Sequence, residues 1–127
     1  MKKEKLAPWE YVVNEEKRTV VYSVLAHGKL FVGKAKCGEG DKFDIEKGKT
    51  IAHMRAILAQ RKYDLELTRE FINSIKIAKG VCEFYHEGSI SSPHYMRAIQ
   101  AACDEERAQL AHIADIKKRL SVECAIA

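Results

Sequence analysis

The stretch Lys29–Ala56, KLFVGKAKCGEGDKFDIEKGKTIAHMRA, decides the predicted fold class of this 127-residue chain. Residues 29–36 alternate in the manner of a β-strand, with Leu30 and Val32 on one face and the intervening residues on the other. Residues 38–41 are glycines and acids, which end a strand, and a helical pattern begins near residue 46. The stretch therefore predicts a strand, a tight turn and the start of a long helix.

Two further strands precede this stretch. Residues 8–13 alternate, and residues 18–25, RTVVYSVL, are rich in β-branched and aromatic side chains, which favour strands. His27-Gly28 then closes a hairpin, because glycine tolerates the positive φ of a tight turn. Residues 8–36 are therefore predicted to form a small antiparallel β-meander.

A long helix is expected over residues 46–79. Its apolar residues recur at intervals of three, four and seven: Ile51, Met54, Leu58, Leu65, Ile72 and Ile75. Such a helix would be about 50 Å long. Either it breaks near Tyr63-Asp64 or its far half packs on another subunit, and we favour the second interpretation.

An aromatic linker is expected over residues 80–92, because Gly80 is a plausible helix stop. Ser92-Pro93 predicts the start of a second helix, over residues 93–122. Its expected buried face is Met96, Ile99, Cys103, Leu110, Ile113 and Leu120. The fold class is thus α+β: one oligomeric domain, residues 1–127, with a β-meander followed by two long helices.

Composition excludes several classes of protein. No apolar run is long enough to span a membrane, and the N-terminus lacks the apolar core of a signal peptide, so we expect a cytoplasmic protein with its four cysteines reduced. The five histidines show no metal-binding spacing, and no catalytic arrangement is recognisable. We therefore expect no metal, no cofactor and no enzymatic activity.

Positive charge is concentrated in residues 29–62, where nine Lys or Arg residues face four Asp or Glu residues. Backbone N–H groups at a helix N-terminus bind anions, so a possible phosphate site lies at the start of the first helix. Its candidate residues are Lys36, Lys42, Lys47, Lys49 and Arg55. The simpler interpretation is a strand-to-helix turn, capped by Asp41 or Asp44, with Phe43 in the core.

A second candidate site is the linker. Phe84 and Tyr85 would point to opposite sides of an extended chain, so one is expected in the core and the other available for stacking on a nucleobase. The predicted ligand-binding residues are Phe84, Tyr85, His86, Tyr95, Arg97 and Arg107, where Arg107 could face inward beside the linker. The alternative is that the aromatic rings only fasten the linker to the helices.

The passage GKAKC-x-x-x-D-x-F-D-x-E-K-G looks like a pattern found in many small phage proteins, and the similarity covers residues 29–56. The order of small sheet, long helix, aromatic linker and second helix resembles the Thoeris anti-defence sponge family of the first type. That resemblance implies a phage protein that sequesters a cyclic ADP-ribose isomer, or a cyclic oligonucleotide, without degrading it. It also implies a dimer or hexamer, with an adenine stacked on Phe84 or Tyr85 and phosphates met by Arg97 and Arg107.

The leading hypothesis is therefore a phage-encoded, non-enzymatic protein that sequesters a cyclic nucleotide immune signal in the host cytoplasm and so blocks antiviral defence. One alternative is a small basic nucleic-acid-binding protein, although no helix-turn-helix or RNP motif is present. The other is a helical, oligomeric protein inhibitor whose long helices form the interface.

Overall fold

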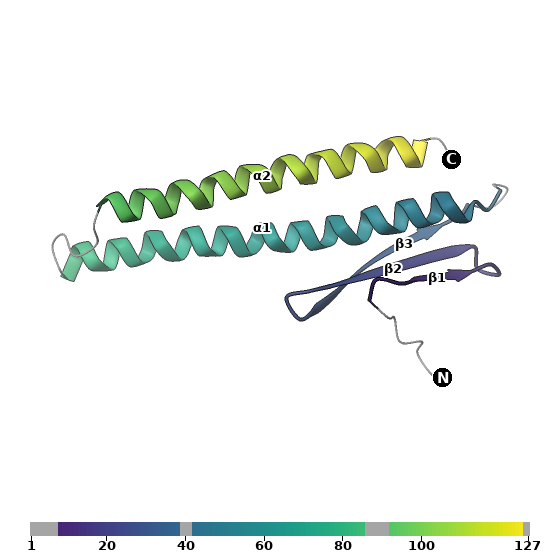
Figure 1. The fold of residues 1–127 in the computed structure, drawn as a ribbon, viewed down its shortest axis with the longest axis horizontal. Coiled ribbons are helices and arrows are strands. Elements are labelled where there is room, and N and C mark those ends of the chain that lie inside the picture. Colours follow the sequence, from purple (N-terminus) through teal and green to yellow (C-terminus); the bar gives the residue numbers. More distant parts are fainter. Residues whose placement is uncertain (1–7, 39–41, 86–91, 126–127) are drawn as a thin grey trace. The chain divides into compact units, whose positions relative to one another are not determined.

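The computed structural model describes residues 8–38, 42–85 and 92–125, and only the backbone at 79–85, 92–94 and 125. The chain divides into two compact units. Unit 1 comprises residues 1–61 and 113–127, and unit 2 comprises residues 62–112. The boundary falls within both long helices (Figure 1).

Unit 1 contains a three-stranded antiparallel sheet in the order β1-β2-β3. The strands are β1, Tyr11–Asn14; β2, Thr19–Ala26; and β3, Lys29–Lys36. His27 and Gly28 have φ of 53° and 71°, as the turn of a two-residue hairpin requires, and β2 pairs with β3 from Ala26↔Lys29 to Thr19↔Lys36. The predicted meander is confirmed.

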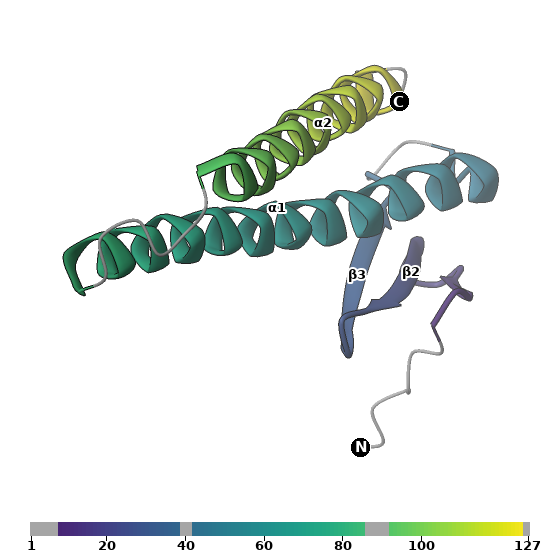
Figure 2. The ribbon, with the colours of Figure 1, turned by 60° about the vertical axis from the view of Figure 1, so that its left-hand side comes forward.

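The first half of helix α1 (Ile45–Tyr85) covers one face of this sheet (Figure 2). The core beneath it consists of Val20, Tyr22, Val24, Ala35, Ala52 and Ala56. Leu30 and Val32 are exposed on the opposite face, as the alternation in β3 predicted.

Small residues allow the helix to approach the strands closely. A Cβ atom on Gly33 of β3 would overlap the carbonyl oxygen of Ala52 and the amide nitrogen of Ala56, and one on Gly48 would lie 2.7 Å from a methyl group of Val20. Gly48, Ala52 and Ala56 are spaced four residues apart, so they lie along one face of α1. Backbone-to-backbone contact therefore sets the distance between α1 and β3.

The boundaries of α1 differ from those expected. The helix is continuous at Tyr63-Asp64, and it passes through Gly80 to end at Tyr85 rather than at residue 79. Glycine costs only about 1 kcal/mol inside a helix. This cost is too small to end a long helix whose other residues favour helical structure. Phe84 therefore belongs to the last turn of α1 and not to an extended linker, so the predicted alternation of sides does not apply.

Unit 2 is a pair of helical segments, the second half of α1 and the first part of α2 (Ser92–Ala125). Leu65 and Ile72 are buried on α1, and Ala102 is buried on α2. An ion pair joins the two segments, with 3.0 Å between Arg69 Nε and Glu106 Oε2.

The buried face of α2 agrees with the expected one only in part: Ile113 is buried, and Ile99, Cys103 and Leu120 are half-buried. Met96 is 57% exposed and Leu110 is 42% exposed, whereas Ala102 is buried. The sequence pattern favours the larger side chains. In the structure, however, the half-buried residues are Tyr95 and Gln109, which immediately precede Met96 and Leu110. One residue corresponds to about 100° around a helix, enough to move these side chains into solvent.

The α+β class and the element order are confirmed. Among the helices in the described residues, none has the length and apolar character needed to cross a lipid bilayer.

Candidate functional site

A cavity of about 690 Å³ lies where β3 leads into α1. It is lined by residues 35–38, 42–48 and 51. A volume of this size falls within the range of small-molecule sites, about 300–1,000 Å³. The cavity lies at the start of the first helix, the region in which the sequence suggested a possible phosphate site.

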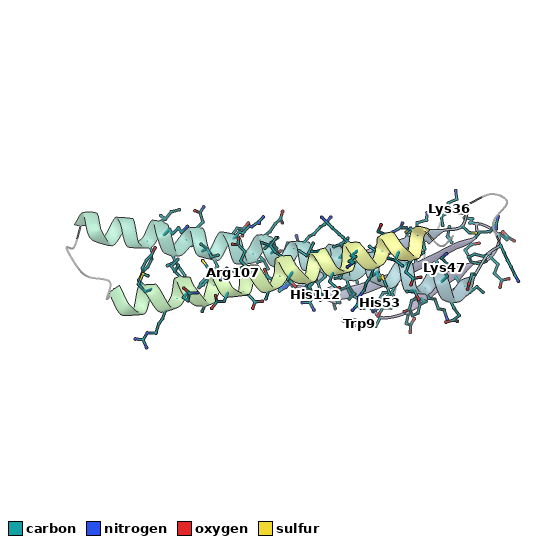
Figure 3. The ribbon with its side chains drawn as sticks, turned by 90° about the horizontal axis from the view of Figure 1, so that it is seen from above. Trp9, Lys36, Lys47, His53, Arg107 and His112 are labelled. Atoms are coloured by element: carbon teal, nitrogen blue, oxygen red, sulfur yellow. The ribbon has the colours of Figure 1, made fainter. Side chains whose placement is uncertain are left out.

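Three of the five residues predicted for that site line the cavity. Lys36 comes from the end of β3, Lys42 from the segment before the helix and Lys47 from the first turn of α1. Figure 3 shows Lys36 and Lys47 at the same end of unit 1. These side chains place positive charge around the cavity, and apolar groups of Ala35, Phe43 and Ile51 form other parts of its wall.

Two carboxylates also line this cavity, and both have structural roles. Asp44 Oδ1 accepts a hydrogen bond from the backbone N–H of Lys47 at 3.1 Å, so Asp44 is the N-cap of α1. Glu46 pairs with Lys49 at 3.8 Å. The predicted cap is confirmed at Asp44, while Asp41 lies outside the described residues. Phe43 packs against the core as expected.

Lys49 lies away from the cavity. Its ammonium is 5.4 Å from the centre of the Tyr11 ring, which in turn lies 4.5 Å from the ring of Tyr22. Burial, followed by the nearby Tyr22 and Glu46, raises the pKa of the Tyr11 phenol. The cation is thus held on the covered face of the sheet.

Arg55 also lies away from the cavity. Its Nη1 donates a 2.6 Å hydrogen bond to the carbonyl oxygen of Lys34, and its Nη2 lies 3.8 Å from Cys124 Sγ. The guanidinium is therefore engaged at the edge of β3. Neither Lys49 nor Arg55 belongs to the group that lines the cavity.

The ligand-binding set predicted downstream is only partly visible. The side chains of Phe84 and Tyr85 and the whole of His86 lie outside the described part of the chain. Tyr95 is half-buried and Arg97 is exposed, and two residues correspond to about 200° around a helix, so the two side chains leave opposite sides of α2.

Arg107 does not face inward. Its side chain is 76% exposed, and its Nη1 lies 3.9 Å from the carboxylate of Asp104 one turn earlier on the same helix. The preceding residue, Glu106, takes the inward position and meets Arg69 instead. Ligand binding by the downstream set stays a prediction.

Sequence reasoning missed Lys17 and Arg18, which line a second cavity, of about 450 Å³, beside the first. Both lie in the turn between β1 and β2, distant in sequence from the quoted stretch. The signal was available in the hairpin, because a register that pairs Thr19 with Lys36 places Arg18 opposite Cys37.

Among the described residues, no group of three or more His, Cys, Asp or Glu side chains is arranged to hold a metal ion. Comparison of the chain with protein-family models, curated protein sequences and solved structures gives no match. The resemblance to the sponge family therefore stays a hypothesis.

Proposed function

We propose that this chain is a non-enzymatic protein that sequesters a small nucleotide anion. The observation that carries the proposal is the cavity between β3 and α1, with Lys36, Lys42 and Lys47 around an interior that includes the ring of Phe43. Lysine ammonium groups form charge-assisted hydrogen bonds with phosphate, and aromatic or aliphatic side chains pack against a nucleobase. Its volume of about 690 Å³ is ample for a nucleotide.

The narrower proposal is a phage-encoded protein whose ligand is a cyclic nucleotide immune signal, such as a cyclic ADP-ribose isomer. It is supported by the resemblance of the strand-turn-helix motif and of the element order. Sequestration of such a signal in the host cytoplasm would block antiviral defence. It requires tight binding and no chemical step.

A thermal-shift screen tests both levels of the proposal. The probes are cyclic ADP-ribose isomers, cyclic di- and trinucleotides, and duplex DNA. A ligand at 100 times its dissociation constant adds about 2.7 kcal/mol of apparent stability. Absence of a shift with every nucleotide refutes the proposed function, and a shift with DNA alone favours the nucleic-acid alternative.

Charge-reversal variants locate the bound ligand. Lys47→Glu should weaken the binding of a ligand held in the cavity. Lys62→Glu on the same helix is the matched control, because Lys62 is exposed and does not line the cavity. Arg107→Ala and Phe84→Ala test the downstream set. Loss of binding in those two variants, with Lys47→Glu unaffected, would move the site to the downstream residues.

We also propose that the chain self-associates through unit 2. Phe71 is 56% exposed and Ile77 is 61% exposed, in addition to Met96. Exposed large apolar side chains on a helical pair are candidates for an interaction surface. Light scattering coupled to size-exclusion chromatography should give a dimer or hexamer, and a monomer at all concentrations would refute this part of the proposal.

A further inference from the structure

Two cavities share a wall at the end of β3. The larger one leads toward the start of α1, and the smaller one, of about 450 Å³, lies toward the turn between β1 and β2. Lys36, Cys37 and Gly38 line both. A ligand that contacts this shared wall can therefore extend into either cavity.

The two cavities differ in charge. Among the residues that the structure describes, the smaller cavity is lined by the cations Lys17, Arg18 and Lys36 and by no carboxylate. The larger cavity includes Asp44 and Glu46 together with its lysines. Because like charges repel, an anionic group is better placed in the smaller cavity.

The larger cavity has the apolar wall. Ala35, Phe43 and Ile51 line it, whereas Cys37 has the one apolar side chain among the described residues that line the smaller cavity. The Phe43 ring packs against the core and is held there. A flat, weakly polar group such as a nucleobase therefore fits the larger cavity better.

Arg18 is held in position by Cys37. The backbone N–H of Cys37 donates to the carbonyl oxygen of Arg18 at 2.9 Å, and Arg18 Nη2 donates to Cys37 Sγ at 3.2 Å. The Cys37 thiol also contacts the carbonyl oxygen of Lys42 at 3.6 Å. The same cysteine thus ties together the two segments that border the cavities.

The turn that carries Arg18 is ordered by its own contacts. Asn14 Oδ1 accepts a hydrogen bond from the backbone N–H of Lys17 at 3.0 Å, and Arg18 has a φ of 55°. A positive φ is uncommon outside glycine, asparagine and aspartate. A guanidinium fixed by its backbone and by a neighbouring sulfur loses less entropy when it binds an anion.

We propose that the two cavities form one divided site, in which a phosphate group is bound by Arg18 in the smaller cavity while a nucleobase occupies the larger cavity against Phe43. This inference rests on the proposed function and refines it. Arg18 is the principal phosphate ligand, and Lys17 and Lys36 supplement its charge. The N-terminus of α1, already capped by Asp44, is not the phosphate site.

Isothermal titration calorimetry with AMP, adenosine and inorganic phosphate tests this division. Arg18→Gly removes the guanidinium and accepts the positive φ, and Arg18→Asn is a second variant that tolerates the same backbone. Each variant should lower the affinity for AMP about tenfold or more, as expected for a lost charge-assisted hydrogen bond. The affinity for adenosine should not change. Lys62→Ala is the matched control for the loss of one positive charge. Inorganic phosphate should compete with AMP but not with adenosine.

The outcomes separate this inference from the proposed function. If AMP binds and Lys47→Ala weakens it while both Arg18 variants behave as Lys62→Ala does, the divided site is wrong and nucleotide binding stands. If phosphate alone binds and adenosine never does, the nucleobase assignment is wrong. If neither AMP nor any cyclic nucleotide binds the wild-type chain, both proposals fail. Circular dichroism of each variant must match the wild type for these comparisons to hold.

Discussion

Replacement of Gly33 by alanine tests the central feature of unit 1, the direct contact between β3 and α1. A methyl group at this position would overlap backbone atoms of Ala52 and Ala56. Backbone atoms cannot rotate away as side chains do, so the helix must move off the strand. Val20 and Val24, which are fully buried beneath the helix, would then lose part of their packing.

The expected cost is large for one added methyl group. Overpacking costs about 1–3 kcal/mol, and partial exposure of a buried valine adds a fraction of the roughly 1.5–3 kcal/mol that its burial contributes. Gly→Ala also stabilises by about 0.4–1 kcal/mol through the unfolded state, which opposes this cost. We therefore expect the free energy of unfolding to fall by about 2–3 kcal/mol.

Urea denaturation followed by circular dichroism measures this loss. Val32→Ala is the control, since Val32 neighbours Gly33 in β3 but lies exposed on the opposite face, and its loss should stay below about 1 kcal/mol. Adding Ala52→Gly should not rescue Gly33→Ala, because the overlap involves the backbone. A Gly33→Ala variant as stable as the wild type would refute the close contact between β3 and α1.

Further predictions concern the cap, the helical pair and pH. Asp44→Ala removes the N-cap of α1 and should cost about 1 kcal/mol in urea denaturation. Ile72→Ala should cost about 2–5 kcal/mol because Ile72 is 8% exposed, whereas Asn73→Ala, at an exposed neighbouring position, should change stability by less than about 0.5 kcal/mol; equal costs would contradict the assignment of the buried face. Because the pKa of Tyr11 is raised in the folded chain, the folded chain retains the phenolic proton at a pH at which the unfolded chain has lost it. The free energy of unfolding should therefore decrease as the pH rises above about 10, the ordinary pKa of tyrosine. Urea denaturation at several pH values should show a smaller decrease for Tyr11→Phe.

The sheet could be predicted from sequence because its signals are local. Alternation in residues 29–36 and the glycine of His27-Gly28 each fix a feature within a few residues. The N-cap at Asp44 is of the same kind. These patterns depend on backbone geometry and need no knowledge of distant parts of the chain.

The errors arose where local signals are weak. Gly80 predicts the end of the helix, yet the cost of one glycine is smaller than the helical preference of the residues around it, and α1 continues to Tyr85. Met96 and Leu110 were preferred as core residues by size, whereas the small Ala102 takes the buried position. The face of a helix that becomes buried depends on the helix against which it packs. The apolar pattern of one helix alone does not contain that information.

The candidate site was found only in part for a related reason. The lysines of the quoted stretch are adjacent in sequence, and three of them do line one cavity. Arg18 lies beside the cavity because β2 pairs with β3. Predicting its position requires both the turn before β2 and the register of the two strands. Lys49 and Arg55 do not line this cavity, because proximity in sequence does not fix the side of the helix from which a side chain extends.

The hydrogen bond from Arg55 to the carbonyl oxygen of Lys34 has a further consequence, because β3 is an outer strand of the three-stranded sheet. An outer strand offers unpaired backbone groups to any other extended chain, which invites aggregation. By occupying one of these acceptors with a charged side chain, α1 limits the growth of the sheet. Arg55, which the sequence suggested as a phosphate contact, thus blocks one backbone acceptor through which another chain could extend the sheet.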